Sequence, residues 1–84
     1  MYNVIVSRKA EKALDELPND YYKLIIKHLL DLEQNPRPFG YIKLTNMENT
    51  YRIRVGVYRI IYTIQDDILT INVIKIDHRS SAYK

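Results

Sequence analysis

The sequence contains no cysteine among its 84 residues. This absence excludes disulfide bonds and thiolate metal sites, so the stability of the fold has to come from packing. A hydrophobic content of 46% is enough for one compact core, and we expect a single domain over residues 1–84. No apolar run approaches the roughly 18 residues of a membrane span, and the first residues are too few for an export signal. We therefore expect a cytoplasmic protein with no membrane partner.

Acidic residues are scarce in the second half of the chain, which makes the charge uneven. Residues 1–36 carry five basic and six acidic side chains, a net charge of −1, whereas residues 37–84 carry eight basic and four acidic ones, a net charge of +4. Five of the six arginines lie in the second half. Because the planar guanidinium fork suits phosphate, this asymmetry predicts a scaffold in the first half and an anion-binding surface in the second.

The order of the predicted elements is typical of an α+β domain. From the N-terminus they are a strand at 1–6, helices at 8–17 and about 20–34, strands at 41–44, 51–55, 58–64 and 68–76, and a polar tail at 77–84. Ser7 is expected to cap the first helix, and Asn19 or Asp20 the second. We predict an antiparallel helical hairpin packed on one face of a largely antiparallel sheet of four to five strands.

Each helix carries an apolar stripe at helical spacing, which is expected to face the sheet. The stripes consist of Ala10, Ala13, Leu14 and Leu17 in the first helix, and of Tyr22, Ile25, Ile26, Leu29 and Leu30, with Leu32 near the end, in the second.

Two runs of period 2, joined at Gly56, place arginines on one face of a predicted hairpin. Because strand side chains alternate between faces, Arg52 and Arg54 point away from the apolar residues between them, and Arg59 of the return strand does the same. One alternative is a solvated sheet face on which arginines protect against aggregation. Three clustered guanidiniums instead favour a phosphate-bearing partner such as a nucleic acid, and Lys43 and Lys75 are further candidates for binding it.

The tail adds three groups of different chemistry. His78 titrates near neutrality, Arg79 is a fixed cation, and Tyr83, four residues later, is an aromatic that can stack on a base. The tail follows a strand predicted to pair with 58–64, so its start is expected at the same sheet as Arg59.

Residues 51–56 and 58–62, together with His78, Arg79 and Tyr83, resemble the RelE family of the RelE/ParE superfamily, the toxins of type II toxin–antitoxin systems. The resemblance implies a ribosome-dependent endoribonuclease that cuts mRNA in the ribosomal A site. It also implies a RelB-like antitoxin that binds and silences the toxin in a hetero-oligomer. The family's functional positions correspond to Arg52 and Arg54 on the strand, Arg59 in the hairpin, and Arg79 and Tyr83 in the tail.

The chemistry of such a site needs no metal or other cofactor. The 2′-hydroxyl of RNA attacks the adjacent phosphorus in line when a base removes its proton, the added negative charge is stabilised, and the leaving 5′-oxygen is protonated. We expect Arg59 and Arg79 to clamp the phosphate, with Arg52 and Arg54 holding the flanking backbone.

The proton-transfer roles remain open between two residues. Well-studied relatives carry lysines at the positions of Arg52 and Arg54, and one of those lysines is a proposed general base. Arginine does not deprotonate in proteins, so Arg54 cannot take that role. This leaves His78 and Tyr83 as candidates for the base.

Two other functions are compatible with the sequence. A ParE-like toxin on the same fold poisons DNA gyrase by binding and cuts no RNA. A plain nucleic-acid-binding module needs the cations but neither His78 nor Tyr83, and salt-dependent binding without cleavage would identify it.

Overall fold

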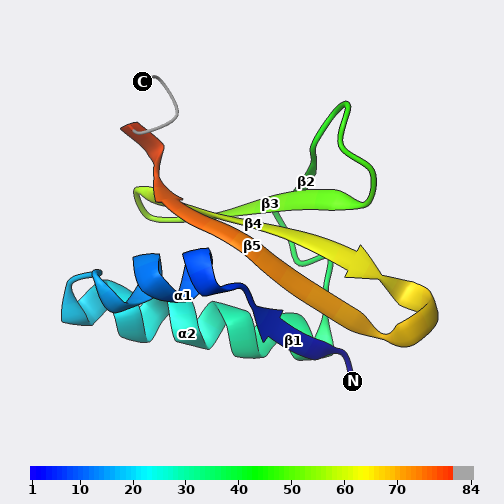
Figure 1. Cartoon of the computed structure of the whole chain (residues 1–84), viewed down its shortest axis with the longest axis horizontal. Helices are drawn as coiled ribbons and strands as arrows, with labels where there is room; N and C mark the ends of the chain where they lie inside the picture. Colours follow the sequence, from blue (N-terminus) through cyan, green and yellow to red (C-terminus); the bar gives the residue numbers. More distant parts are fainter. Residues whose placement is uncertain (81–84) are drawn as a thin grey trace.

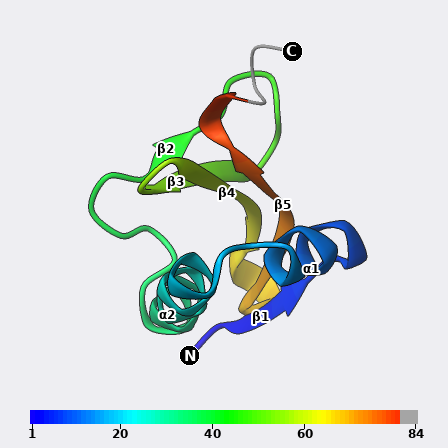
Figure 2. The ribbon, with the colours of Figure 1, turned by 90° about the vertical axis from the view of Figure 1, so that its left-hand side faces the viewer.

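Five strands form one sheet, and both helices lie against the same face of it (Figure 1; Figure 2). The computed structural model describes residues 1–80. The strand order is β1-β5-β4-β3-β2. The edge strand β1 (Asn3–Val6) runs parallel to β5 (Thr70–His78), and the remaining neighbours are antiparallel: β4 (Tyr58–Gln65), β3 (Thr50–Val55) and β2 (Ile42–Lys43). The predicted α+β class, with a helical hairpin on a largely antiparallel sheet, is confirmed.

The two helices begin in different ways. Ser7 caps α1 (Arg8–Asp15), because its Oγ accepts a hydrogen bond from the amide of Ala10 at 3.1 Å, as predicted. α2 (Asn19–Gln34) has Pro18 at its cap position and no side-chain cap, so the expected cap by Asn19 or Asp20 is wrong. Proline fixes its own φ, which is −55° here, and the Pro18 carbonyl accepts a hydrogen bond from the amide of Tyr22 at 2.9 Å.

The core lies between the helices and the apolar face of the sheet. It includes Ile53, Val55, Ile60 and Tyr62, whose side chains point to the face opposite that of the strand arginines. From α2 the buried residues are Ile25, Leu29 and Leu32. The predicted stripe is wrong at its margins, since Tyr22 and Leu30 remain 38% and 58% exposed.

The last strand is displaced along the chain relative to the prediction. Residues 66–68 form a 3-10 helix, η1 (Asp66–Ile68), and Leu69 has a left-handed φ of 49°, so β5 starts only at Thr70. It then continues to His78 because Asp77 and His78 still pair with Arg59 and Tyr58 of β4. The polar tail therefore begins two residues later than expected.

The hairpin between β3 and β4 turns at Gly56, where φ is +60°. A Cβ at this position would lie 2.9 Å from Cε1 of Tyr21, so both the backbone conformation and the close approach of α2 require glycine. The turn brings Arg54 directly opposite Arg59. Among residues 1–80, no helix is long and apolar enough to cross a membrane.

Candidate nucleic-acid interface

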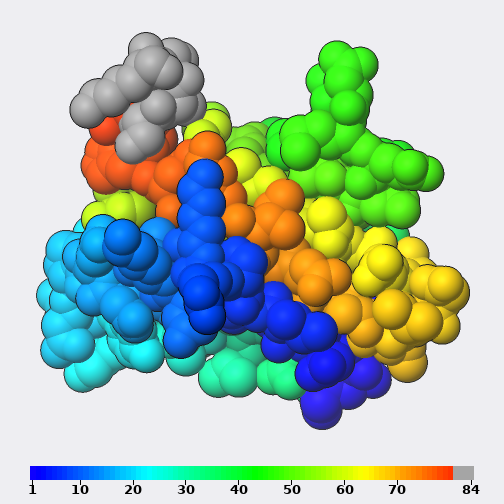
Figure 3. Space-filling model, viewed as in Figure 1, coloured from blue at the N-terminus to red at the C-terminus, as the bar shows by residue number. Residues whose placement is uncertain are grey.

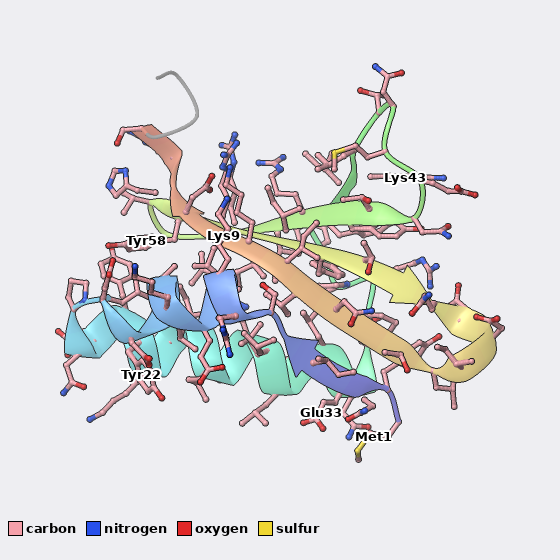
Figure 4. The ribbon with its side chains drawn as sticks, in the orientation of Figure 1. Met1, Lys9, Tyr22, Glu33, Lys43 and Tyr58 are labelled. Atoms are coloured by element: carbon pink, nitrogen blue, oxygen red, sulfur yellow. The ribbon has the colours of Figure 1, made fainter. Side chains whose placement is uncertain are left out.

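The face of the sheet away from the helices carries two rows of side chains across three strands. Residues directly opposite each other on neighbouring strands share a face. One row consists of Arg54, Arg59 and Asp77, and the next of Arg52, Ile61 and Lys75. Nitrogen-tipped side chains accordingly stand on this side of the sheet in Figure 4. We call this surface, made of Arg52, Arg54, Arg59, Lys75 and Asp77, the arginine face.

The arginines of this face lie close enough to affect one another. The pKa of Arg52 is lowered, first by burial and then by the positive charges of Arg54 and Arg59. Arg54 is exposed, whereas Arg52 and Arg59 are half-buried. The predicted cluster of three guanidiniums is thus brought together, and its mutual repulsion favours an anionic partner.

The arginine face also contains a carboxylate. Nε and Nη2 of Arg59 donate hydrogen bonds to the two oxygens of Asp77 at 3.0 and 2.8 Å, and Nζ of Lys75 lies 3.4 Å from the same carboxylate. Burial alone would raise the pKa of Asp77, but the hydrogen bond and charge of Arg59 and the charge of Lys75 lower it. Asp77 is therefore a charged member of the site. Sequence reasoning missed it, because the register that pairs β4 with β5 is not visible in the periodicity.

His78 is not brought together with the arginines. It lies directly opposite Tyr58, and the two rings meet edge to face at 5.4 Å between centroids. Tyr58 in turn packs against Tyr21 of α2, at 4.8 Å between ring centroids. Because residues directly opposite each other share a face, His78 lies on the helix side of the sheet. Nδ1 of His78 accepts a hydrogen bond from the amide of Ser80 at 3.1 Å. Adjacent strand residues point to opposite faces, so Asp77 and His78 cannot share the arginine face.

The other predicted residues occupy the margins. Arg79 is exposed, and its amide donates to the carbonyl of Val57 at 2.7 Å, which ties it to the hairpin turn between Arg54 and Arg59. Lys43 lies on the edge strand β2, opposite Tyr51 rather than an arginine. Beyond it, residues 44–49 form a lobe that projects above the sheet (Figure 3). Tyr83 lies outside the described residues.

One flank of the arginine face is hollowed between β3 and α2. Arg52 and Arg54 line this hollow of about 600 Å³ on one side, and His28 and Asp31 line it on the other. The fully exposed ring of Phe39 lies at its rim. The sequence carried no signal for this hollow, because its walls come from segments far apart in the chain. Within residues 1–80, no three His, Asp or Glu side chains are grouped so that they could hold a metal ion.

Known proteins share both the sequence pattern and the fold. The family model described as "ParE toxin of type II toxin-antitoxin system, parDE" matches residues 4–83. The chain is 31% identical over 86 residues to the protein of Methanocaldococcus jannaschii that is named "Putative toxin RelE1", covering 99% of this chain and 96% of the relative. It is 27% identical over 84 residues to toxin RelG of Mycobacterium tuberculosis, covering 99% and 97%.

A solved structure extends this likeness to three dimensions. The archaeal RelE–RelB complex from Pyrococcus horikoshii OT3 contains a chain with a TM-score of 0.84 and 32% identity, over 93% of this chain and 94% of that one. The chain thus shares its sequence and its overall fold with known toxins. The protein is a member of the RelE/ParE superfamily of type II toxins and, within it, of the RelE family.

Proposed function

We propose that this chain is a ribosome-dependent endoribonuclease that cleaves mRNA in the A site and so stops translation in the cytoplasm. The observation that carries the proposal is the arginine face. Arg52, Arg54 and Arg59 lie together on the open side of the sheet, and Arg79 lies beside the hairpin turn. Guanidiniums bind phosphate in a bidentate manner, and their fixed charge stabilises the negative charge that develops during phosphoryl transfer.

The cations divide into two roles in this proposal. Arg59 and Arg79 contact the phosphate that is attacked, and Arg52 and Arg54 hold the neighbouring backbone. Lys75 adds a positive charge beside Asp77. Lys43 lies opposite the buried Tyr51 and so off the arginine face, and it binds RNA that passes the sheet edge. The arginines of this set stay protonated at neutral pH and cannot accept a proton. Another group therefore has to act as the base.

Tyr83 is assigned the proton transfer from the 2′-hydroxyl. Nearby arginines favour the phenolate form of a tyrosine, which makes it a better base than an isolated phenol. The ring of His78 lies on the other face, against Tyr58, so we assign His78 no part in the proton transfer. In-line attack requires RNA held in a distorted geometry, and the ribosome is the platform that holds it.

The partner we propose is a RelB-like antitoxin that forms a hetero-oligomer with the toxin. The structural relative from Pyrococcus horikoshii is described as a RelE–RelB complex. An antitoxin that brings acidic side chains to the arginine face would neutralise the charge on which RNA binding depends.

Inhibition of DNA gyrase is the second candidate, because the matching family model is described by the name of ParE. The two functions differ in whether a phosphodiester bond is cut. A gyrase inhibitor acts by protein contact and leaves mRNA intact.

Primer extension on a defined mRNA in translating ribosomes tests the proposal. We expect wild-type protein to cut within the A-site codon, and Arg59→Ala to lower the cleavage rate by at least about a hundredfold. Lys23→Ala, a change of an exposed cation on α2, is the matched control and should cut like wild type. An intact message, combined with loss of gyrase supercoiling, would overturn the nuclease and establish the second candidate.

A further inference from the structure

The carboxylate of Asp77 occupies a place in the arginine face that a phosphate could take. It lies directly opposite Arg59, which lies directly opposite Arg54, so the three side chains form one row across β3, β4 and β5. Arg59 holds it through Nε and Nη2 at 3.0 and 2.8 Å. This paired arrangement of two parallel hydrogen bonds is also the arrangement by which arginine binds a phosphodiester.

The carboxylate is held in this place by its contacts with the two cations. The side chain of Asp77 is only 10% exposed and that of Arg59 only 20%, so the ion pair is largely shielded from solvent. Nζ of Lys75, in the neighbouring row, lies 3.4 Å from Oδ2 of Asp77, the oxygen that also accepts from Nη2 of Arg59. A phosphate that approaches Arg59 from solvent therefore meets donors already occupied and a negative charge a few ångströms away, which repels it.

We propose that Asp77 is a specificity-determining residue that competes with the nucleic-acid backbone for Arg59. Nucleic acid then binds tightly only where contacts outside this row help to displace the carboxylate, and free single strands bind weakly. The inference rests on the proposed function, since it explains how an RNA-cutting face could ignore RNA that no ribosome presents. Selectivity arises here from an unfavourable contact with the wrong ligand.

Binding of a short, fluorescein-labelled 2′-O-methyl RNA tests the inference. This probe lacks the 2′-hydroxyl nucleophile, so binding is measured without cleavage. We expect Asp77→Asn to tighten binding by about tenfold at low salt, because a neutral amide holds the Arg59 guanidinium less strongly than the carboxylate does and leaves its donors to the phosphate. The plot of log affinity against log salt should become steeper by about 0.7, as for one more neutralised phosphate of a single strand.

The matched control separates a local effect from net charge. Asp67→Asn changes the net charge by the same amount, but Asp67 lies in η1, at the opposite end of β5 from Asp77 (Figure 1). We expect less than about a twofold change for this variant. Equal tightening by both variants, or no tightening by Asp77→Asn, would overturn the inference.

A double-mutant cycle identifies Arg59 as the group in competition. In an Arg59→Ala background, Asp77→Asn should change affinity by less than about twofold, because the occupied donors are gone. A full tenfold gain in that background would show that Asp77 acts without Arg59 and would refute the mechanism.

A further test uses the wild-type protein, so its result does not depend on whether a variant folds. In protein labelled with ¹⁵N at arginine, the Nε–H signal of Arg59 should shift as the 2′-O-methyl RNA reaches saturation, since the RNA replaces the carboxylate. An unchanged signal at saturation would contradict the competition. The two hypotheses fail separately. If wild-type protein does not cut in the A site but Asp77→Asn binds RNA about tenfold more tightly, the nuclease is refuted and the competing carboxylate stands. If wild-type protein cuts but Asp77→Asn binds no more tightly, the nuclease stands and the competition is refuted.

Discussion

The hydroxyl of Tyr62 donates a hydrogen bond to the backbone carbonyl of Pro36 at 2.8 Å, inside the core. This bond links the centre of β4 to the segment that follows α2, and the neighbouring ring of Tyr51 stacks on Tyr62 at 6.0 Å. Both partners of the bond are buried. A buried carbonyl that loses its donor keeps the full cost of its desolvation.

The first prediction is that Tyr62→Phe destabilises the fold by about 1 to 2 kcal/mol, because the Pro36 carbonyl is left without this donor. Urea unfolding followed by circular dichroism measures the difference. Tyr22→Phe, which removes a hydroxyl from a 38% exposed side chain, should change the stability by less than about 0.5 kcal/mol. Equal effects of the two changes would mean that the Tyr62 hydroxyl contributes nothing particular.

The second prediction concerns alkaline pH. Burial raises the pKa of Tyr62 to about 12, against the lowering effect of the charge of Arg37. As the pH rises, Tyr62 ionises in the unfolded chain at a lower pH than in the folded protein. The contribution of its buried hydroxyl to the free energy of unfolding is therefore complete below about pH 10 and is lost as the pH rises through 12. Absorbance of phenolate should show a late step near pH 12 that is missing in Tyr62→Phe. A late step that survives in the variant would assign it to another tyrosine.

The alternation of residues 51–62 was sufficient to predict the three arginines of the arginine face. A period of 2 assigns each side chain to one of two faces once the strand is recognised, and Arg52, Arg54 and Arg59 follow that rule. The same rule failed for His78, because alternation assigns a face only to residues inside a strand and the end of β5 was predicted too early. Ending β5 at residue 76 left Asp77 and His78 without a face, whereas two more residues of pairing place them on opposite ones.

The contact between Arg59 and Asp77 could not be predicted from any local pattern. It depends on the register between β4 and β5, and that register shifts at a bulge between Ile61 and Tyr62. The bulge changes which residues oppose each other beyond it, and periodicity along one strand carries no information about it. The hollow beside α2 was hidden for a similar reason, since its walls meet only after the helices pack.

The third prediction separates the roles of the two tail residues in cleavage. His78→Ala should leave the rate of A-site cutting within about twofold of wild type, because its ring lies against Tyr58 on the helix side. Tyr83→Phe should lower that rate by at least about a hundredfold, the usual contribution of a general base. Single-turnover cleavage on programmed ribosomes provides the rates. A large loss in His78→Ala with its fold intact would return the proton transfer to histidine.

The fourth prediction concerns the hairpin turn. Gly56→Ala should destabilise the fold by about 1 to 2 kcal/mol or more, since alanine is strained at a φ of +60° and its Cβ would press against the Tyr21 ring. Gly40→Ala is the matched control, because Gly40 also has a positive φ, of +89°, but a methyl group added there would have no neighbour within 4 Å. Thermal unfolding measures the loss of stability in both variants, and the difference between the two losses gives the cost of the contact with Tyr21 apart from the backbone strain. A loss no greater at Gly56 than at Gly40 would show that Tyr21 gives way freely.

The fifth prediction concerns acid pH and the carboxylate of the arginine face. At about pH 7, Asp77→Asn should destabilise the fold by about 1 to 3 kcal/mol, because charge-assisted hydrogen bonds to a mostly buried Arg59 are lost.

Burial acts to raise the pKa of Asp77, but Arg59 and Lys75 outweigh it, so the pKa is lowered in the folded state. As the pH falls, the unfolded chain therefore takes up this proton first. The contribution of the pair is present above the ordinary pKa of 3.8 and is lost as the pH falls through the lower folded value. Urea unfolding of wild type and variant from about pH 7 downward should therefore show two curves that converge only below pH 3.8. Curves that stayed parallel throughout would mean that folding leaves the pKa of Asp77 unchanged, so that Arg59 and Lys75 do not stabilise its ionised form. A carboxylate held so weakly could not compete with a phosphate for Arg59.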